Sequence, residues 1–328
     1  MRSLRLLALL ALSCAVGAAL SGCSGEETSF TERLEKADES FRSRLYEEAG
    51  TEYEAIAEDA IAAGDTTTYV EACAMRARTH LIAGRIDEGR TWLDQAGARA
   101  DKTDPPAWSR FLGVRGRFEW QADQDPGMAS ETFEEMFAYC EGREQWDRAV
   151  DAAHMVAITG EPGERFEWAR RGIAMAESGG MGGWLGPLWN NLGWDYVDAG
   201  QYEEALEALE NAREYHYRHG DSLSKLIADY SVAHAKLKLG RLADAKLMMR
   251  EVFETAERMH GKGSPNGIEW MGMSRWDLGE IAVAEGEMGV ATDLMTKALN
   301  ELEQAGMPDW APDDWAERTL RLEEITGQ

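Results

Sequence analysis

The chain has 328 residues, of which 44% are hydrophobic and 29% are charged, and its formal net charge is −26. This length and composition allow two ordinary domains or one long repeat array with a packed core. The acidic charge argues against binding to nucleic acid, which requires a basic surface, and against charge-driven binding to anionic lipid. It suits a soluble surface or a protein with a basic partner.

The first 22 residues have the layout of a secretory signal. Two arginines precede an apolar run over residues 6–20, which is shorter than the ~20 residues of a membrane-spanning helix. Residues 20–23 then read Leu-Ser-Gly-Cys. These four residues match the lipobox of bacterial lipoproteins at every position, and an ordinary cleaved signal with an incidental cysteine is the alternative.

The lipoprotein resemblance implies that residues 1–22 are removed and that Cys23 carries lipid on its sulfur and an acyl chain on its amine. Several chains anchor durably, because each buried methylene contributes about 0.8 kcal/mol. Ser24, in place of Asp, favours the periplasmic face of the outer membrane, with the cell surface or the inner membrane as alternatives. Residues 23–29 would form a tether of only about 20 Å, so we expect the protein to work close to its membrane.

Beyond the leader, the cysteines are Cys73 and Cys140, 67 residues apart. A disulfide is one possibility in an oxidising compartment. Because the two residues fall in different predicted repeats, we expect two buried free thiols instead. The chain has no CxxC motif and no Cys/His cluster, so structural zinc is not expected.

Apolar residues of the remaining chain recur at three- and four-residue steps, which predicts helices throughout. Proline damages helix interiors, so we expect the eight prolines to mark the breaks between helices. Gly200 is expected to end one helix, because glycine adopts the left-handed conformation readily.

The segment 189–212 resembles the tetratricopeptide repeat. The matching residues are Trp189, Leu192, Gly193, Tyr196, Gly200, Tyr202, Ala205, Leu209 and Ala212. The small residues Gly193 and Ala205 would let two antiparallel helices approach closely. Similar spacing recurs in other parts of the chain, most clearly at 278–298 and 240–249, and only weakly at 110–145 and 150–178.

The predicted repeat units start near residues 30, 70, 110, 150, 186, 226 and 272, a step of about 40 residues. The resemblance therefore predicts an all-α solenoid of seven helical hairpins, a right-handed superhelix, over residues 30–304. Residues 305–328 are expected to form a C-terminal capping helix, since end repeats need a polar outer face.

In tetratricopeptide proteins the first helix of each pair lines a concave groove, so the resemblance assigns candidate partner-binding positions. Packing between repeats is the alternative role for several of them. The family's carboxylate clamp is doubtful here because lysine is sparse. The candidate groove residues are Arg78, Asn190, Asn191, Trp194, Tyr230, His234, Trp276 and Glu280.

Other motifs are weaker. The glycine-rich segment 179–183 lacks the strand and the Lys-Ser/Thr of a phosphate-binding loop, so we interpret it as a link between repeats. His216 and His219 share a helix face but have no evident third ligand, so no metal site is predicted. No catalytic set and no cofactor site are evident.

These features together predict a lipid-anchored scaffold or adaptor of the bacterial cell envelope, which binds peptides or helices of envelope proteins in its groove. A repeat protein that senses a small molecule is the alternative, and an enzyme is not expected. Architecture alone identifies neither the partner nor the pathway.

Overall fold

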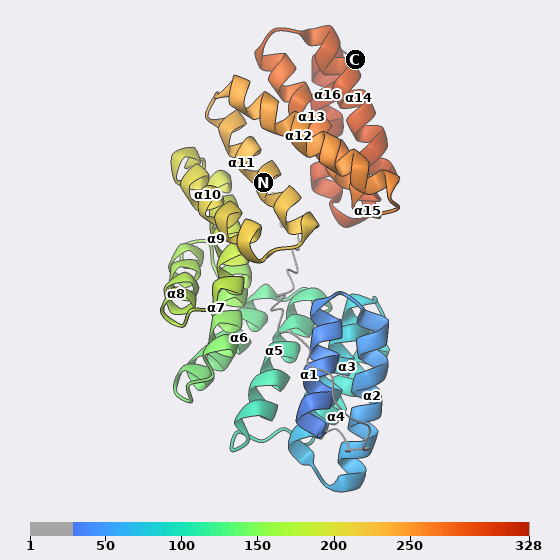
Figure 1. Ribbon diagram of the computed structural model, residues 1–328, viewed down its shortest axis with the longest axis vertical. Helices are drawn as coiled ribbons and strands as arrows, with labels where there is room; N and C mark the ends of the chain where they lie inside the picture. Colours follow the sequence, from blue (N-terminus) through green and yellow to red (C-terminus); the bar gives the residue numbers. More distant parts are fainter. Residues whose placement is uncertain (1–28, 328) are drawn as a thin grey trace, which may run out of the picture. The chain divides into compact units, whose positions relative to one another are not determined.

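The computed structural model describes residues 29–327 (Figure 1). Within this range it contains sixteen helices and no strand. The predicted leader and Cys23 lie outside the described residues. No helix of the described part has the length and apolar character needed to cross a membrane.

Fourteen of the helices form seven consecutive pairs, each with a first and a second helix. The pairs are α1 (Phe30–Arg42) with α2 (Tyr46–Ala63), α3 (Thr66–Ile82) with α4 (Ile86–Gly97), α5 (Pro105–Gln121) with α6 (Pro126–Glu141), α7 (Trp146–Thr159) with α8 (Arg165–Ser178), α9 (Gly182–Asp198) with α10 (Tyr202–His219), α11 (Ser222–Lys238) with α12 (Leu242–Gly261), and α13 (Gly267–Ala284) with α14 (Met288–Gln304). Each pair starts within a few residues of its predicted position, so the predicted all-α repeat array is confirmed.

The turns inside the pairs explain why the helices end where they do. Gly200 has φ 72° and Gly84 also has φ 72°, each directly before the second helix of its pair. This left-handed conformation reverses the direction of the chain. Glycine adopts it at the lowest energetic cost because it has no Cβ. Arg44 and Gln124 occupy the corresponding turns with φ 65° and 56°. The turn geometry therefore persists in repeats where the glycine is missing.

Aspartates cap the starts of three of the seven first helices. The side chains of Asp65, Asp104 and Asp221 accept hydrogen bonds from backbone N–H groups in the first turns of α3, α5 and α11. Proline stands at the start of α5, where its missing N–H is not needed. Pro187 is an exception to the predicted breaks, because it lies inside α9. It is near the start of the helix, where it removes only one intrahelical hydrogen bond.

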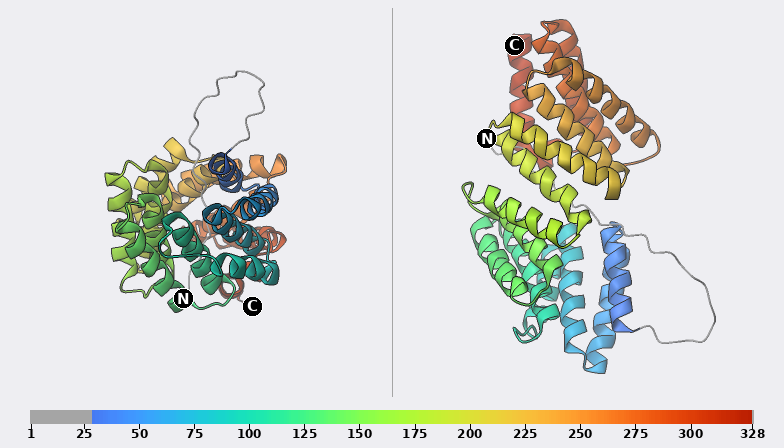
Figure 2. Two further views of the ribbon diagram at one scale, coloured as in Figure 1. Left: turned by 90° about the horizontal axis from the view of Figure 1, so that it is seen from below. Right: turned by 60° about the vertical axis from the view of Figure 1, so that its left-hand side comes forward.

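The described chain divides into two compact units, an N-terminal unit that ends at Leu188 and a C-terminal unit that begins at Trp189. Within each unit the helix pairs follow one another in chain order (Figure 2). Buried apolar side chains from neighbouring pairs form continuous cores, such as Tyr53, Val70, Cys73 and Phe118 in the N-terminal unit. Each pair thus buries its apolar face against the next one.

Two further helices, α15 (Met307–Trp310) and α16 (Pro312–Thr326), follow the last pair. Met307 is fully buried and belongs to the core of the C-terminal unit. The helix α16 contacts α14 and covers the end of the array.

Candidate functional site on the first helices

Aromatic side chains from consecutive first helices of the C-terminal unit meet on one face. The rings of Trp194 on α9 and His234 on α11 have centroids 5.1 Å apart, and Tyr230 lies between α9 and α13. The Tyr230 ring is 6.3 Å from Trp194 and 5.1 Å from Trp270 on α13. We call Trp194, Tyr230, His234 and Asp277 the aromatic cluster. Three of its members were predicted as groove residues.

The carboxylate of Asp277 on α13 orients the His234 ring. The distance from Nδ1 of His234 to Oδ2 of Asp277 is 2.7 Å, and the Asp277 side chain is only 3% exposed. Burial opposes ionisation of this carboxyl, but the contact with His234 holds its pKa below the ordinary value. Because Nδ1 of His234 faces this carboxylate, Nε2 is the ring nitrogen left for another partner. Nε2 has no partner among the described residues.

A second set of hydrogen bonds ties α9 to α11. The indole Nε1 of Trp194 donates to Oγ of Ser231 at 3.1 Å, and this hydroxyl donates to Oδ1 of Asn190 at 3.3 Å. Asn190 and Ser231 are buried, so their polar atoms satisfy one another. Asn191, the next residue on α9, is half-buried.

The last two predicted groove residues, Trp276 and Glu280, are contacted by the C-terminal helix α16. The guanidinium of Arg318 lies over the Trp276 ring at 5.0 Å from its centroid. The two carboxylate oxygens of Glu280 accept hydrogen bonds from Arg321 at 3.2 and 3.3 Å. The face that carries these two residues is therefore covered by this chain's own helix.

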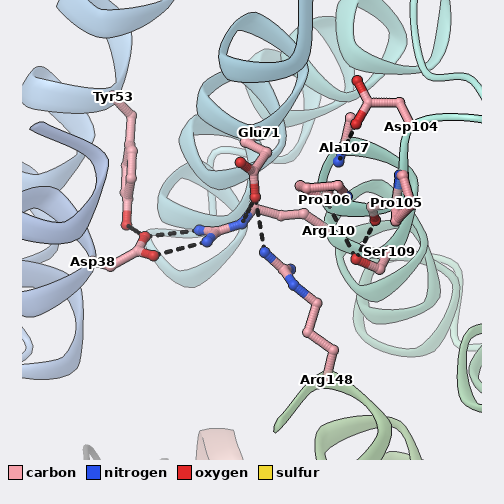
Figure 3. A network of polar contacts seen from close by, with 10 residues as sticks. All are labelled: Asp38, Tyr53, Glu71, Asp104, Pro105, Pro106, Ala107, Ser109, Arg110 and Arg148. Carbon is pink, nitrogen blue, oxygen red and sulfur yellow. Dashed lines mark hydrogen bonds and ion pairs between the residues drawn. The ribbon is translucent and has the colours of Figure 1, made fainter. Parts of the chain in front are cut away.

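The N-terminal unit has a different first-helix face, which is dominated by ion pairs (Figure 3). Arg110 on α5 donates to both oxygens of Asp38 on α1, at 2.7 and 2.8 Å. Its Nε lies 3.0 Å from Glu71 on α3, and Arg148 on α7 donates to the same Glu71 oxygen at 2.8 Å. Tyr53 on α2 donates to Asp38 at 2.5 Å. First helices of four successive pairs are thereby connected.

Electrostatics explains why this network stays ionised despite its burial. Burial opposes the charge on Arg110, but the carboxylates of Asp38 and Glu71 hold its pKa above the ordinary value. Burial likewise opposes ionisation of Asp38, and Arg110 outweighs it, so the pKa of Asp38 is lowered. Two carboxylates and two guanidiniums balance in charge, as buried ions require.

Arg78, the predicted groove residue of the N-terminal unit, lies outside this network. It is 4% exposed, and its Nη1 donates to the neutral amide oxygen of Gln121 at 2.8 Å. Burial and the nearby Arg117 lower its pKa to about 9. Arg117 itself has Asp151 as a partner at 2.6 Å.

The structure thus brings four predicted residues together on the C-terminal unit, Asn190, Trp194, Tyr230 and His234, and leaves their binding role a prediction. Asn190, Tyr230 and Trp276 are buried and pack between helices, whereas Asn191, Trp194, His234 and Glu280 are partly exposed. Sequence reasoning missed Asp277, Ser231, Arg318 and the whole ion-pair network. Asp277 and Ser231 directly follow predicted residues, which was the only signal for them.

The described residues hold no group of three or more His, Cys, Asp or Glu side chains placed to bind a metal ion. Cys73 and Cys140 are free and buried, as predicted. Burial raises the pKa of each thiol to about 11, so neither is an activated nucleophile. The chemistry of the first-helix faces is that of hydrogen bonding, ring stacking and ion pairing.

Residues 190–216 and 231–266 match the family model of the tetratricopeptide repeat. No curated protein is significantly similar to this chain in sequence. The family match coincides with the two pairs α9–α10 and α11–α12, where the sequence resemblance is strong.

Solved structures share the fold at low sequence identity. The apo form of RapI is similar with a TM-score of 0.68 and 12% identity, over 91% of this chain and 81% of RapI. A signal transduction ATPase with a tetratricopeptide repeat sensor from Pyrococcus horikoshii is similar with a TM-score of 0.65 and 14% identity, over 85% of this chain. The present chain spans only 43% of that protein.

A third similar structure is a Rap protein in complex with competence and sporulation factor, with a TM-score of 0.58 and 13% identity. The match covers 84% of this chain and 77% of the Rap protein. At these identities the likeness concerns the fold, which is an all-α array of tetratricopeptide-like helical hairpins.

Proposed function

We propose that this protein is a lipid-anchored adaptor of the bacterial cell envelope that binds other proteins on the first-helix face of its C-terminal unit. The observation that carries the proposal is the aromatic cluster, in which a buried carboxylate orients the partly exposed His234 beside Trp194. Aromatic rings next to a polar group of fixed orientation are the usual anchors of protein interfaces.

The repeat architecture supports the same proposal. Helical-hairpin arrays present long surfaces built from first helices, which suits peptides or partner helices better than compact substrates. One of the similar structures, the Rap protein, is a complex with competence and sporulation factor. This comparison supports the binding of a peptide or protein in general.

The anchor rests on the lipobox at residues 20–23, which ends in Cys23. We place the protein at the periplasmic face of the outer membrane, because Ser24 follows the cysteine. A Cys23→Ser variant should lose incorporation of an alkyne-labelled fatty acid and move from the membrane fraction to the soluble one. Equal labelling of the variant and the wild type would contradict lipidation at Cys23.

The test of binding is co-purification from membranes solubilised in a neutral detergent, with partners identified by mass spectrometry. Trp194→Ala and His234→Gln are the test variants, and the conservative second one preserves the size of the side chain. Trp146→Ala/His260→Ala is the matched control, because it removes an exposed tryptophan and an exposed histidine elsewhere. Circular dichroism verifies that each variant is folded.

We expect a defined set of proteins to be lost with both test variants and retained with the control. Retention of every partner by both folded test variants would contradict a binding role for the aromatic cluster. Loss of the same partners from the control would also contradict it.

A small-molecule sensor is the second candidate, favoured by one observation. The similar protein from Pyrococcus horikoshii is described as carrying a tetratricopeptide repeat sensor. In this chain, a hollow of about 670 Å³ between α10, α11 and α12 has a size suited to a small ligand. Seven of its ten lining residues are charged, which is unlike the apolar lining of most ligand pockets. Thermal stabilisation by a metabolite library would favour this alternative.

A further inference from the structure

The C-terminal helix α16 lies beside α13 and α14 (Figure 1). It covers apolar side chains that these two helices contribute. The covered side chains include Trp276 on α13 and Met295 and Ala298 on α14, all of them buried. From α16, the half-buried Leu322 and Ile325 pack against them. This is the face that would receive the first helix of another pair.

The helix α16 is held on this surface only lightly. None of its residues is buried, in contrast to α11 or α13. Its polar contacts with α13 are Arg318 over the Trp276 ring and Arg321 with Glu280, and Arg318 also reaches the sulfur of Met273. The half-buried Trp315 of α16 packs against the core of the C-terminal unit. Elements with few buried apolar contacts open locally at low free energy. Detachment of α16 would expose the apolar face of α13 and α14, with Glu280 at its edge.

The charge of α16 is poorly matched to its position. Residues 312–326 contain two arginines and five carboxylates, a net charge of −3, on a chain whose formal net charge is −26. The two arginines both contact α13, and Arg321 also pairs with Glu324 of α16 itself. Burial raises the pKa of Asp314; Arg318 opposes this, while Glu317, Asp313 and Asp198 add to the rise. A helix with the same contact residues and a basic outer side would suit this surface better.

We propose that the α13–α14 face under α16 is a docking surface for a basic amphipathic helix of a partner protein, and that α16 is the intramolecular occupant that this helix replaces. The contacts of α16 define the pattern of the incoming helix. It carries an aromatic residue in the place of Trp315 and arginines in the places of Arg318 and Arg321. Apolar residues follow in the places of Leu322 and Ile325. The inference rests on the proposed function, since it specifies the kind of partner.

The test uses the full chain in a neutral detergent and a fluorescent synthetic peptide. The peptide has the sequence of residues 311–327 with its five acidic residues replaced by lysine. The substitutions are Asp313→Lys, Asp314→Lys, Glu317→Lys, Glu323→Lys and Glu324→Lys. Its control carries glutamate in place of both arginines. Fluorescence anisotropy measures binding, and hydrogen exchange of residues 312–326 reports on displacement of α16.

We expect the basic peptide to bind, the control peptide not to bind, and amides of α16 to exchange about tenfold faster in the complex. An Arg318→Glu/Arg321→Glu variant weakens the intramolecular occupant and should bind the peptide about tenfold more tightly. Arg258→Glu on α12 is the matched charge control, because Arg258 is exposed and its guanidinium hydrogen-bonds Thr255 of the same helix. It should bind the peptide as the wild type does.

Absence of binding to both the wild type and the Arg318→Glu/Arg321→Glu variant, with both folded by circular dichroism, overturns the proposal. Peptide binding without faster exchange of α16 also overturns it, because the peptide then binds elsewhere. A concentration-dependent dimer in which α16 exchanges between copies would identify a second copy of this chain as the occupant and overturn the partner helix. None of these outcomes affects the test of the aromatic cluster, so the two proposals fail separately.

Discussion

Arg110 and Asp38 are 72 residues apart in the chain, yet their side chains form two parallel hydrogen bonds of 2.7 and 2.8 Å. The pair joins α5 directly to α1, although α2, α3 and α4 lie between them in the chain. Most contacts of a repeat array connect neighbouring repeats. This pair extends further and couples the stability of the first and third helix pairs.

We therefore expect Arg110→Ala to destabilise the N-terminal unit by about 3 to 5 kcal/mol, because it leaves the largely buried Asp38 and Glu71 without a shared counter-charge. Urea unfolding measures the change. Glu141→Ala is the control, since the Arg171–Glu141 pair is exposed on both sides and should contribute only about 0 to 1 kcal/mol. Equal losses for the two variants would contradict the role assigned to the network.

A glycine pair tests the packing of the helical hairpins. A Cβ at Gly193 would lie 2.5 Å from Cγ and Cδ2 of Leu209 on the facing helix, so Gly193→Ala should destabilise the C-terminal unit by about 1 to 3 kcal/mol. Gly289 on α14 has open space around it. Gly289→Ala should stabilise by about 0.5 to 1 kcal/mol, because alanine is the better helix former. Thermal melting distinguishes the two variants, and the same sign of change for both would refute the packing argument.

Glu269 on α13 predicts a pH dependence of stability. Burial raises the pKa of this carboxyl from 4.5 to about 7. The folded state therefore binds the proton more tightly than the unfolded state, and stability falls as the pH rises from 4.5 to 7. The raised pKa corresponds to a loss of about 3 kcal/mol in the free energy of unfolding when Glu269 ionises. Glu269 lies in the first turn of α13, where the helix dipole favours the carboxylate and reduces this loss by roughly 0.5 to 1 kcal/mol.

A Glu269→Gln variant should thus match the wild type at pH 4.5 and exceed its free energy of unfolding by about 2 kcal/mol at pH 8. Denaturant unfolding at the two pH values is the measurement. Glu257→Gln on the exposed side of α12 serves as the control and should show no such difference. A wild-type advantage at pH 8 would mean that Glu269 is stabilised as a carboxylate.

The cysteines offer a test of both redox state and packing. Cys73 and Cys140 are buried free thiols whose pKa is raised to about 11, so they should not react with a thiol reagent in the native protein. A Cys23→Ser chain without residues 1–22 retains Cys73 and Cys140 as its cysteines. When it is unfolded in urea without a reductant, a thiol reagent should detect two free thiols. Titration of no thiols under these conditions would indicate a disulfide.

Two features of this protein follow from its sequence alone. The helical period and the spacing of small residues predicted the seven pairs, because every repeat must bury its own apolar face locally. The register was weak at residues 110–145, and the turn at Gln124 explains why. Its backbone adopts φ 56° without the glycine that marks the same turn at Gly84. The lipobox is likewise a sequence signal, and the lipidation of Cys23 stays a prediction.

Tertiary structure alone decided which polar side chains meet. His234 and Asp277 are 43 residues apart, and Asp38 and Arg110 are 72 residues apart, so their pairing depends on how far each helix pair is rotated against the next. That rotation is set by side-chain packing between pairs, which a periodic pattern does not encode. The same packing places Arg318 and Arg321 of α16 over Trp276 and Glu280. Sequence periodicity thus determines the hairpins, whereas the face they present to a partner depends on packing between pairs.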